Sequence, residues 1–160
     1  MISRSSPSVS SGATIGLAAP AGPVDPDRLD AGEAALVERG FSVARGDDIT
    51  AAEGYLAGDD ERRAREFMDL VRDPGVEAIL CVRGGYGCQR IAPRLDAKEV
   101  RRAAKPLVGY SDVTTLLLWQ ARSAGLGGIH GPMLERGEGG GNEAWDALCQ
   151  ALCGEDAGRA

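Results

Sequence analysis

Short apolar runs alternate with segments of helical period along this chain, and no other feature constrains its fold as strongly. The runs cover residues 13–19, 41–44, 76–82, 106–109 and 128–131. Apolar runs of this length are typical of parallel strands that are covered by helices on both faces. The sequence therefore predicts an α/β fold, a three-layer parallel sheet with helices on both faces.

The segments between the runs predict helices with defined ends. Asp25 fits the N-cap of the first helix, Pro26 fits its first position, and Gly40 ends it. We expect the buried face of this helix to carry Leu29, Leu36 and Val37.

The clearest helical pattern lies near residues 62–71. Its apolar residues follow the i, i+3, i+4, i+7 rule and predict the buried face: Ala64, Phe67, Met68 and Val71. We place the charged residues of this helix away from that face: Arg62, Arg63, Arg65 and Glu66. The last helix of the chain groups its apolar residues in the same way: Trp145, Leu148, Cys149 and Leu152.

Composition and charge exclude several classes of function. A net charge of −6 argues against nucleic acid and anionic membrane surfaces as partners. No apolar run approaches the roughly 18 residues that a membrane helix requires. Four cysteines without a CxxC pair and a single histidine are too few ligands for a zinc site. We therefore expect no metal, no cofactor and a reduced, cytoplasmic protein.

The loop after the fourth apolar run carries a candidate nucleophile. In parallel sheets, ligands bind beyond the carboxyl ends of the strands, and Gly109, Tyr110, Ser111 and Asp112 stand at such an end. A sharp strand-to-helix turn exposes its serine, and the N–H groups of the following helix stabilise negative charge there. The usual elbow also has glycine two residues after the serine, where this chain has Val113. The alternative is that Ser111 only caps the helix.

Two further loops are expected on the same rim. Arg83, Gly84, Gly85, Tyr86 and Gly87 follow the third run, and successive glycines let N–H groups converge on an anion. The spacing matches neither the dinucleotide nor the Walker phosphate loop, so the alternatives are an oxyanion hole and a plain glycine-rich turn.

His130 follows the fifth apolar run and is the one histidine of the chain. A lone histidine beside a strand is more often a hydrogen-bonded structural residue than a catalyst. We keep it as a candidate base for Ser111.

Four short motifs, taken in order, resemble those of the LD-carboxypeptidase family of serine peptidases. They are APAGP at 19–23, RGGYG at 83–87, GYSD at 109–112 and HGPM at 130–133, within a likeness that runs from about Thr14 to Leu152. The resemblance implies an N-terminal domain of the flavodoxin-like or class I glutamine-amidotransferase-like kind. It makes Ser111 the nucleophile and the N–H groups of Gly85 and Asp112 the oxyanion hole. Substrate-binding roles fall to other residues of the motifs: Gly84, Tyr86, Tyr110 and His130.

The same resemblance implies a serine-type carboxypeptidase that removes terminal D-alanine from murein tetrapeptides in cell-wall recycling. In the family a Glu and a His of a C-terminal domain complete the triad, and this chain has no histidine after His130. We therefore expect residues 1–12 to be a disordered leader, 13–136 the nucleophile-bearing domain, and 137–160 a linker and helix leading to an absent C-terminal domain. The resemblance also implies a homodimer, because members of the family commonly form dimers. The alternatives are a microcin C immunity-type peptidase and a non-catalytic peptide-binding or interaction domain.

Overall fold

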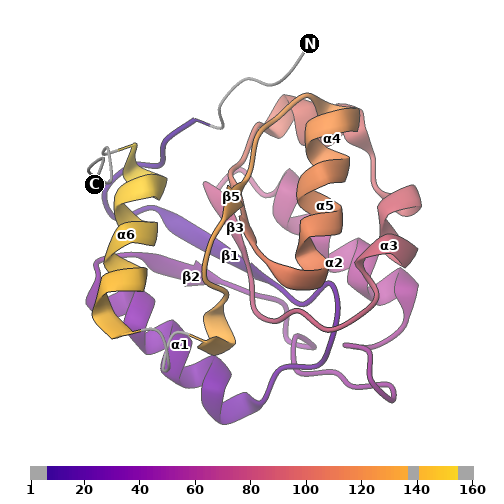
Figure 1. Ribbon diagram of the computed structural model, residues 1–160, viewed down its shortest axis with the longest axis horizontal. Helices are drawn as coiled ribbons and strands as arrows, with labels where there is room; N and C mark the ends of the chain where they lie inside the picture. Colours follow the sequence, from indigo (N-terminus) through magenta and orange to yellow (C-terminus); the bar gives the residue numbers. More distant parts are fainter. Residues whose placement is uncertain (1–6, 137–140, 155–160) are drawn as a thin grey trace.

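The computed structural model describes residues 7–136 and 141–154 and has a parallel sheet at its centre (Figure 1). The sheet holds five strands in the order β2-β1-β3-β4-β5, and each pair of neighbours is parallel. The strands are β1 (Thr14–Ala18), β2 (Ser42–Ala44), β3 (Ala78–Cys81), β4 (Leu107–Gly109) and β5 (Ile129–His130). This is the flavodoxin-like strand order, and the predicted α/β class is confirmed.

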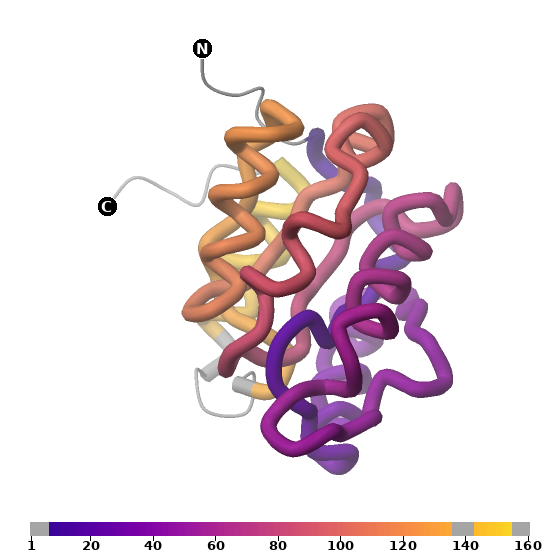
Figure 2. Tube along the Cα trace, turned by 90° about the vertical axis from the view of Figure 1, so that its right-hand side faces the viewer, coloured from indigo at the N-terminus to yellow at the C-terminus, as the bar shows by residue number. Residues whose placement is uncertain are grey.

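Helices cover both faces of the sheet. One face carries α1 (Pro26–Glu38) and α6 (Gly141–Cys153). The other face carries α2 (Asp60–Arg72), α3 (Cys88–Ile91), α4 (Ala97–Ala103) and α5 (Thr114–Trp119). Short turns of 3-10 helix are η1 (Ala92–Arg94), η2 (Ser111–Val113) and η4 (Leu134–Arg136), and η3 (Gln120–Ala124) is a π-helical turn. Figure 2 looks onto the second face, where α3 lies between α2 and α5.

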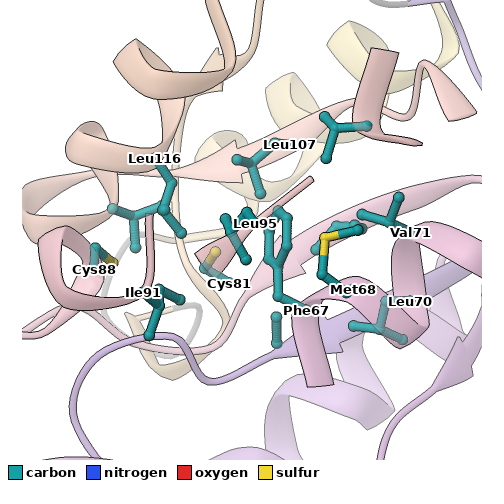
Figure 3. Packing of buried hydrophobic residues seen from close by; sticks show 14 of the residues in the cluster. Phe67, Met68, Leu70, Val71, Cys81, Cys88, Ile91, Leu95, Leu107 and Leu116 are labelled. Atoms are coloured by element: carbon teal, nitrogen blue, oxygen red, sulfur yellow. The ribbon is translucent and has the colours of Figure 1, made fainter. Parts of the chain in front are cut away.

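A separate apolar cluster forms on each face of the sheet. Under α2, the side chains of Phe67 and Met68 point toward Leu107 of β4 and its neighbours (Figure 3). Under α1 and α6, Leu36 and Trp145 pack with apolar side chains of β1, β3 and β4. The continuous apolar runs of the sequence therefore serve two cores, one on each side of the sheet.

The predicted start of α1 is confirmed, and one part of its predicted buried face is wrong. The Asp25 carboxylate accepts hydrogen bonds from two N–H groups of the first turn. Leu29 and Leu36 are buried, but the side chain of Val37 is 59% exposed. The buried face centres on Gly32, where a Cβ would overlap the side chain of Leu134. Val37 lies five positions later, about 140° around the helix, and so faces away from the sheet.

The charged residues of α2 predicted to lie off its apolar face are nevertheless buried in three of four cases. Arg62, Arg63 and Glu66 are buried, and only Arg65 is exposed. Backbone of the preceding loops covers these side chains and supplies a hydrogen-bond partner for each of them. Helix α2 therefore buries a polar face as well as the predicted apolar one.

Residues 7–12 and α6 pack against the domain. Val9 is buried, and its N–H donates to the carbonyl oxygen of Leu152 at 2.8 Å. Residues 7–12, which belong to the expected leader, thus contact the end of α6. In α6 the side chains of Trp145, Leu148 and Leu152 are buried as predicted, because they cover the sheet. Residues 1–6, 137–140 and 155–160, which belong to the expected leader, linker and tail, lie outside the described part.

Among the described helices, none is both long and apolar enough to cross a membrane.

Candidate active site

Ser111 lies where β4 turns into the helical segment formed by η2 and α5. It is exposed, and its backbone φ is +58°, a value that among the described non-glycine residues only Ala104 approaches. A left-handed conformation costs a residue with a side chain about 1–2 kcal/mol. The N-cap positions of η2 and α5 are Tyr110 and Val113, and neither helix has a side-chain cap. Ser111 is thus a strained turn residue and does not cap either helix.

Gly109 permits the sharpness of this turn. A Cβ at Gly109 would lie 2.5 Å from Cγ1 of Val113 and 3.0 Å from its Cβ. Because real side chains do not approach this closely, the chain can fold back here only when position 109 is glycine. Val113 stands where the usual elbow has its second glycine. The absence of a side chain at Gly109 leaves room for it.

The glycine-rich loop after β3 packs directly against Ser111. A Cβ at Gly84 would lie 3.2 Å from the Ser111 Cβ and 3.4 Å from its Oγ. Gly85 follows with a φ of +120°, which strongly favours glycine. The N–H of Gly22, in the loop after β1, donates to the carbonyl oxygen of Gly84 at 3.0 Å. The carboxyl ends of β1, β3 and β4 thus place three loops together around the serine.

Two backbone N–H groups near Ser111 are available to a ligand, since neither donates to another residue of the part that the structure describes. The Gly85 N–H donates no hydrogen bond within the described part of the chain. Asp112 is the second residue of η2, and N–H groups at a helix start lack partners inside the helix. The Asp112 carboxylate accepts a hydrogen bond from the Cys88 N–H at 2.9 Å, which ties the serine turn to the start of α3.

A cavity of about 290 Å³ opens beside Ser111. Its lining combines the predicted loops with three charged side chains: Arg28, Val82, Arg83, Gly84, Gly85, Tyr110, Ser111, Met133 and Glu135. Glu135 forms ion pairs with both Arg28 and Arg83. Arg83 and Met133 lie within the motifs. No sequence signal pointed to Arg28 or Glu135, and these two residues lie 107 positions apart in the chain.

Tyr86 and His130 lie outside this cavity lining. The Tyr86 ring is 41% exposed and packs on Tyr55, with 5.9 Å between ring centroids. The exposed His130 ring meets Tyr110 edge-on, with 6.2 Å between centroids. Of the residues predicted to form the site, the structure brings together Ser111, Gly84, Gly85 and Tyr110 and keeps these two at the periphery.

Arg63 of α2 supports the loops at the site through hydrogen bonds to their backbone. Its side chain is fully buried and donates to the carbonyl oxygens of Pro20 at 2.6 Å and Gly58 at 3.3 Å. Gly87 has a φ of +134°, and a Cβ there would overlap the Arg63 guanidinium. A buried cation therefore supports both the loop after β1 and the loop after β3.

The Cys88 thiol, close to the serine turn, is not a competing nucleophile. Burial raises the pKa of the Cys88 thiol, and the neighbouring Cys81 and Asp112 raise it further. Since the thiolate is the reactive form, Cys88 stays protonated and inert at neutral pH. Within residues 7–136 and 141–154, no three His, Cys, Asp or Glu side chains group in a way that could hold a metal ion.

A parallel α/β sheet that presents a strained, exposed serine at a strand-to-helix turn, next to free backbone N–H groups, is typical of serine hydrolases. Comparison with known families makes this class specific. The model of the LD-carboxypeptidase N-terminal domain matches residues 15–131, and the chain belongs to this family.

Two curated relatives and one solved structure illustrate the likeness. The chain is 42% identical over 123 residues to the probable murein peptide carboxypeptidase of Bacillus subtilis, covering 77% of this chain and 39% of that protein. It is 37% identical over 120 residues to the murein tetrapeptide carboxypeptidase of Pseudomonas aeruginosa, covering 74% and 39%. The chain thus spans about two fifths of the length of these relatives.

The solved structure is that of the microcin C7 self-immunity protein MccF in complex with aspartyl sulfamoyl adenosine. It superposes with a TM-score of 0.86 at 26% identity, covering 99% of this chain and 48% of that one. The predicted fold and family are therefore both confirmed.

Proposed function

We propose that this chain is the nucleophile-bearing N-terminal part of a serine-type LD-carboxypeptidase, a hydrolase that removes terminal D-alanine from murein tetrapeptides. The observation that carries the proposal is the strained Ser111 turn packed against Gly84 and Gly85. Support for the substrate comes from the relatives in Bacillus subtilis and Pseudomonas aeruginosa, whose names specify murein peptides.

The proposed reaction begins at Ser111. Its Oγ attacks the carbonyl carbon that joins the L-centre of the diamino acid to D-alanine, and the carbonyl oxygen becomes an oxyanion. The N–H groups of Gly85 and Asp112 stabilise that oxyanion, a contribution of about 10²–10³ in rate per donor in other hydrolases. The C–N bond then breaks, D-alanine leaves as an amine after gaining a proton, and water hydrolyses the acyl-serine.

The proton of Ser111 requires a base that the cavity does not supply. His130 packs on Tyr110 outside the lining, and Glu135 is paired with two arginines. We propose that a Glu and a His outside this chain, in a C-terminal domain, complete the triad, as the family resemblance implies. The same proposal places the enzyme in the cytoplasm, where murein recycling takes place. It also makes the enzyme a homodimer.

Two other functions fit part of the site. Similarity to MccF favours an immunity-type peptidase, in which the bond cleaved would belong to an aminoacyl nucleotide analogue. The lack of a base in the lining would also suit a domain that binds peptides without cleaving them. Both predict an outcome different from the murein enzyme in a direct assay.

The assay measures D-alanine released from L-Ala-γ-D-Glu-meso-diaminopimelate-D-Ala. The chain alone should release it slowly, since loss of the base leaves only about 10³–10⁴ over water. Joined to the C-terminal part of the Bacillus subtilis relative, it should reach an ordinary enzymatic rate, and Ser111→Ala should return the joined protein to the slow rate. Equal rates for the joined protein with and without Ser111→Ala would refute the nucleophile, and a fast reaction by the chain alone would refute the outside base.

A further inference from the structure

The cavity beside Ser111 contains a group of charged side chains that the proposed chemistry does not use. We propose that Arg28 and Arg83, oriented by Glu135, form the subsite that binds the free carboxylate of the residue to be released. This inference rests on the proposed function and names the side chains that would recognise the C-terminal carboxylate of its substrate.

Glu135 holds the two arginines in fixed positions. Its Oε1 lies 3.3 Å from Nη1 of Arg28, and its Oε2 lies 3.2 Å from Nε of Arg83. Backbone anchors fix the arrangement further, because the Glu135 N–H donates to the carbonyl oxygen of Val82 and Arg83 Nη1 donates to that of Pro23. The group thus joins the start of α1, the loop after β3 and η4 at one wall of the cavity.

Both guanidinium groups keep donors free for a ligand. An arginine has five N–H donors, and the contacts above use one of Arg28 and two of Arg83. Their side chains are 54% and 44% exposed, whereas Glu135 is only 13% exposed. The acid is therefore enclosed while the remaining N–H groups of its partners stay accessible at the cavity, where they can bind a carboxylate in the forked geometry that arginine favours.

The charge of the lining favours an anion. Two guanidinium groups and one carboxylate leave a net positive charge, and the other lining residues are neutral. The same three side chains would be a poor structural clamp, because ion pairs this exposed contribute little to stability. A charged wall that contributes little to stability and lies beside the nucleophile is best explained by ligand binding.

A carboxypeptidase substrate carries a carboxylate close to the bond that the serine attacks. The leaving residue joins its carboxylate to the scissile nitrogen through a single Cα, so the carboxylate lies within one residue of the Ser111 Oγ. At about 290 Å³ the cavity is at the small end of ligand sites, which suits one small terminal residue. A longer peptide would present a neutral amide here and would lose the charge-assisted hydrogen bonds.

The experiment compares binding of the tetrapeptide ending in D-alanine with binding of the same peptide ending in D-alaninamide. Both are titrated into the full chain and followed by NMR or calorimetry. Because a hydrogen bond to a charged group contributes about 1.5–3 kcal/mol, wild type should bind the free acid roughly 10- to 150-fold more tightly. Arg83→Gln and Arg28→Gln should each reduce this preference several-fold, and Arg83→Lys should keep part of it.

Arg94→Gln is the matched control. Its side chain is 47% exposed, similar to that of Arg83, but it pairs with Asp60 and Glu61 away from the cavity. This variant should keep the full preference for the free acid. Thermal unfolding of every variant shows whether a lost preference comes with a lost fold.

Equal binding of acid and amide by wild type, or an unchanged preference in both Arg83→Gln and Arg28→Gln, would overturn the inference. Failure of the proposed function gives a different result, namely no selective reaction of Ser111 with a fluorophosphonate in the protein joined to the C-terminal part of the Bacillus subtilis relative. If Ser111 reacts and the two peptides bind equally, the nucleophile stands and the subsite falls. If the acid is preferred and Ser111 does not react, the subsite stands in a binding domain.

Discussion

Two groups of arginine and glutamate side chains surround the Ser111 loops, and they differ in burial. The buried α2 cluster consists of Arg62, Arg63 and Glu66, and the cavity cluster of Arg28, Arg83 and Glu135. The first is closed off from solvent and bonded mainly to loop backbone, whereas the arginines of the second are half exposed.

Burial determines whether a group of charged side chains supports the fold or is available to a ligand. Arg63 donates to backbone carbonyl oxygens of the loops at the site, so removing it would leave buried polar groups without partners. Arg83 could lose its contacts to water at little cost, since an exposed ion pair is easily replaced by solvent. We therefore expect the α2 cluster to determine stability and the cavity cluster to determine ligand binding.

The largest effect should follow Arg63→Met. Loss of the guanidinium leaves the carbonyl oxygens of Pro20 and Gly58 without their donor, and each buried polar group left unsatisfied costs about 1–3 kcal/mol. Urea unfolding measures the change. Arg65→Met on the same helix is the control, because Arg65 is 56% exposed and should change stability by less than about 0.5 kcal/mol. Equal losses in the two variants would remove the distinction between the clusters.

Glu66→Gln should change the pH dependence of stability. Burial raises the pKa of Glu66, although the Arg62 guanidinium and the Ala19 N–H oppose the shift. Between the ordinary value near 4.5 and this raised value, the folded state binds more protons than the unfolded state, so stability falls as pH rises through that window. Glutamine has no such slope. Urea titrations should show wild type losing stability relative to the variant above pH 4.5, and the opposite trend would contradict the burial argument.

Backbone strain at Ser111 should be visible by comparing two substitutions. Glycine adopts a φ of +58° without strain, whereas alanine does not. The free energy of unfolding of Ser111→Gly should therefore be about 1 kcal/mol larger than that of Ser111→Ala. At Ser123, which lies in η3 and has no positive φ, the order should reverse because alanine is the better helix former. The same order at both positions would show that the turn is not strained.

The smallest change in stability should follow Arg83→Gln. Its side chain is 44% exposed, and we expect a change within about 0.5 kcal/mol in thermal unfolding. The preference for a free carboxylate should fall in the same variant. A stability loss as large as that of Arg63→Met would mean that the cavity cluster is a structural support.

The sequence was sufficient to predict the sheet and the serine turn. Parallel strands buried on both faces produce continuous apolar runs, and parallel order brings the loops after β3 and β4 to one edge. This is why Ser111 and Gly85 could be placed together from the sequence. The burial of Arg63 and Glu66 could not, because helical periodicity assigns charged residues to solvent unless the covering loops are known.

Other parts of the site depend on tertiary contacts that no local pattern records. Arg28 and Glu135 meet across 107 positions of the chain. The packing of residues 7–12 likewise depends on α6, at the other end of the sequence. The proposed domain boundaries, the dimer, and the Glu and His from outside the chain stay predictions.

The most direct test of the central claim is the site at which a fluorophosphonate modifies the chain, read by mass spectrometry of its peptides. If the N–H groups of Gly85 and Asp112 stabilise negative charge at Ser111, that serine should be modified faster than any other serine once the chain is joined to the C-terminal part of the Bacillus subtilis relative. Ser111→Ala should remove the adduct, and Arg83→Gln should retain it. Modification spread evenly over the serines, or unchanged in Ser111→Ala, would contradict the assignment of Ser111 as the nucleophile.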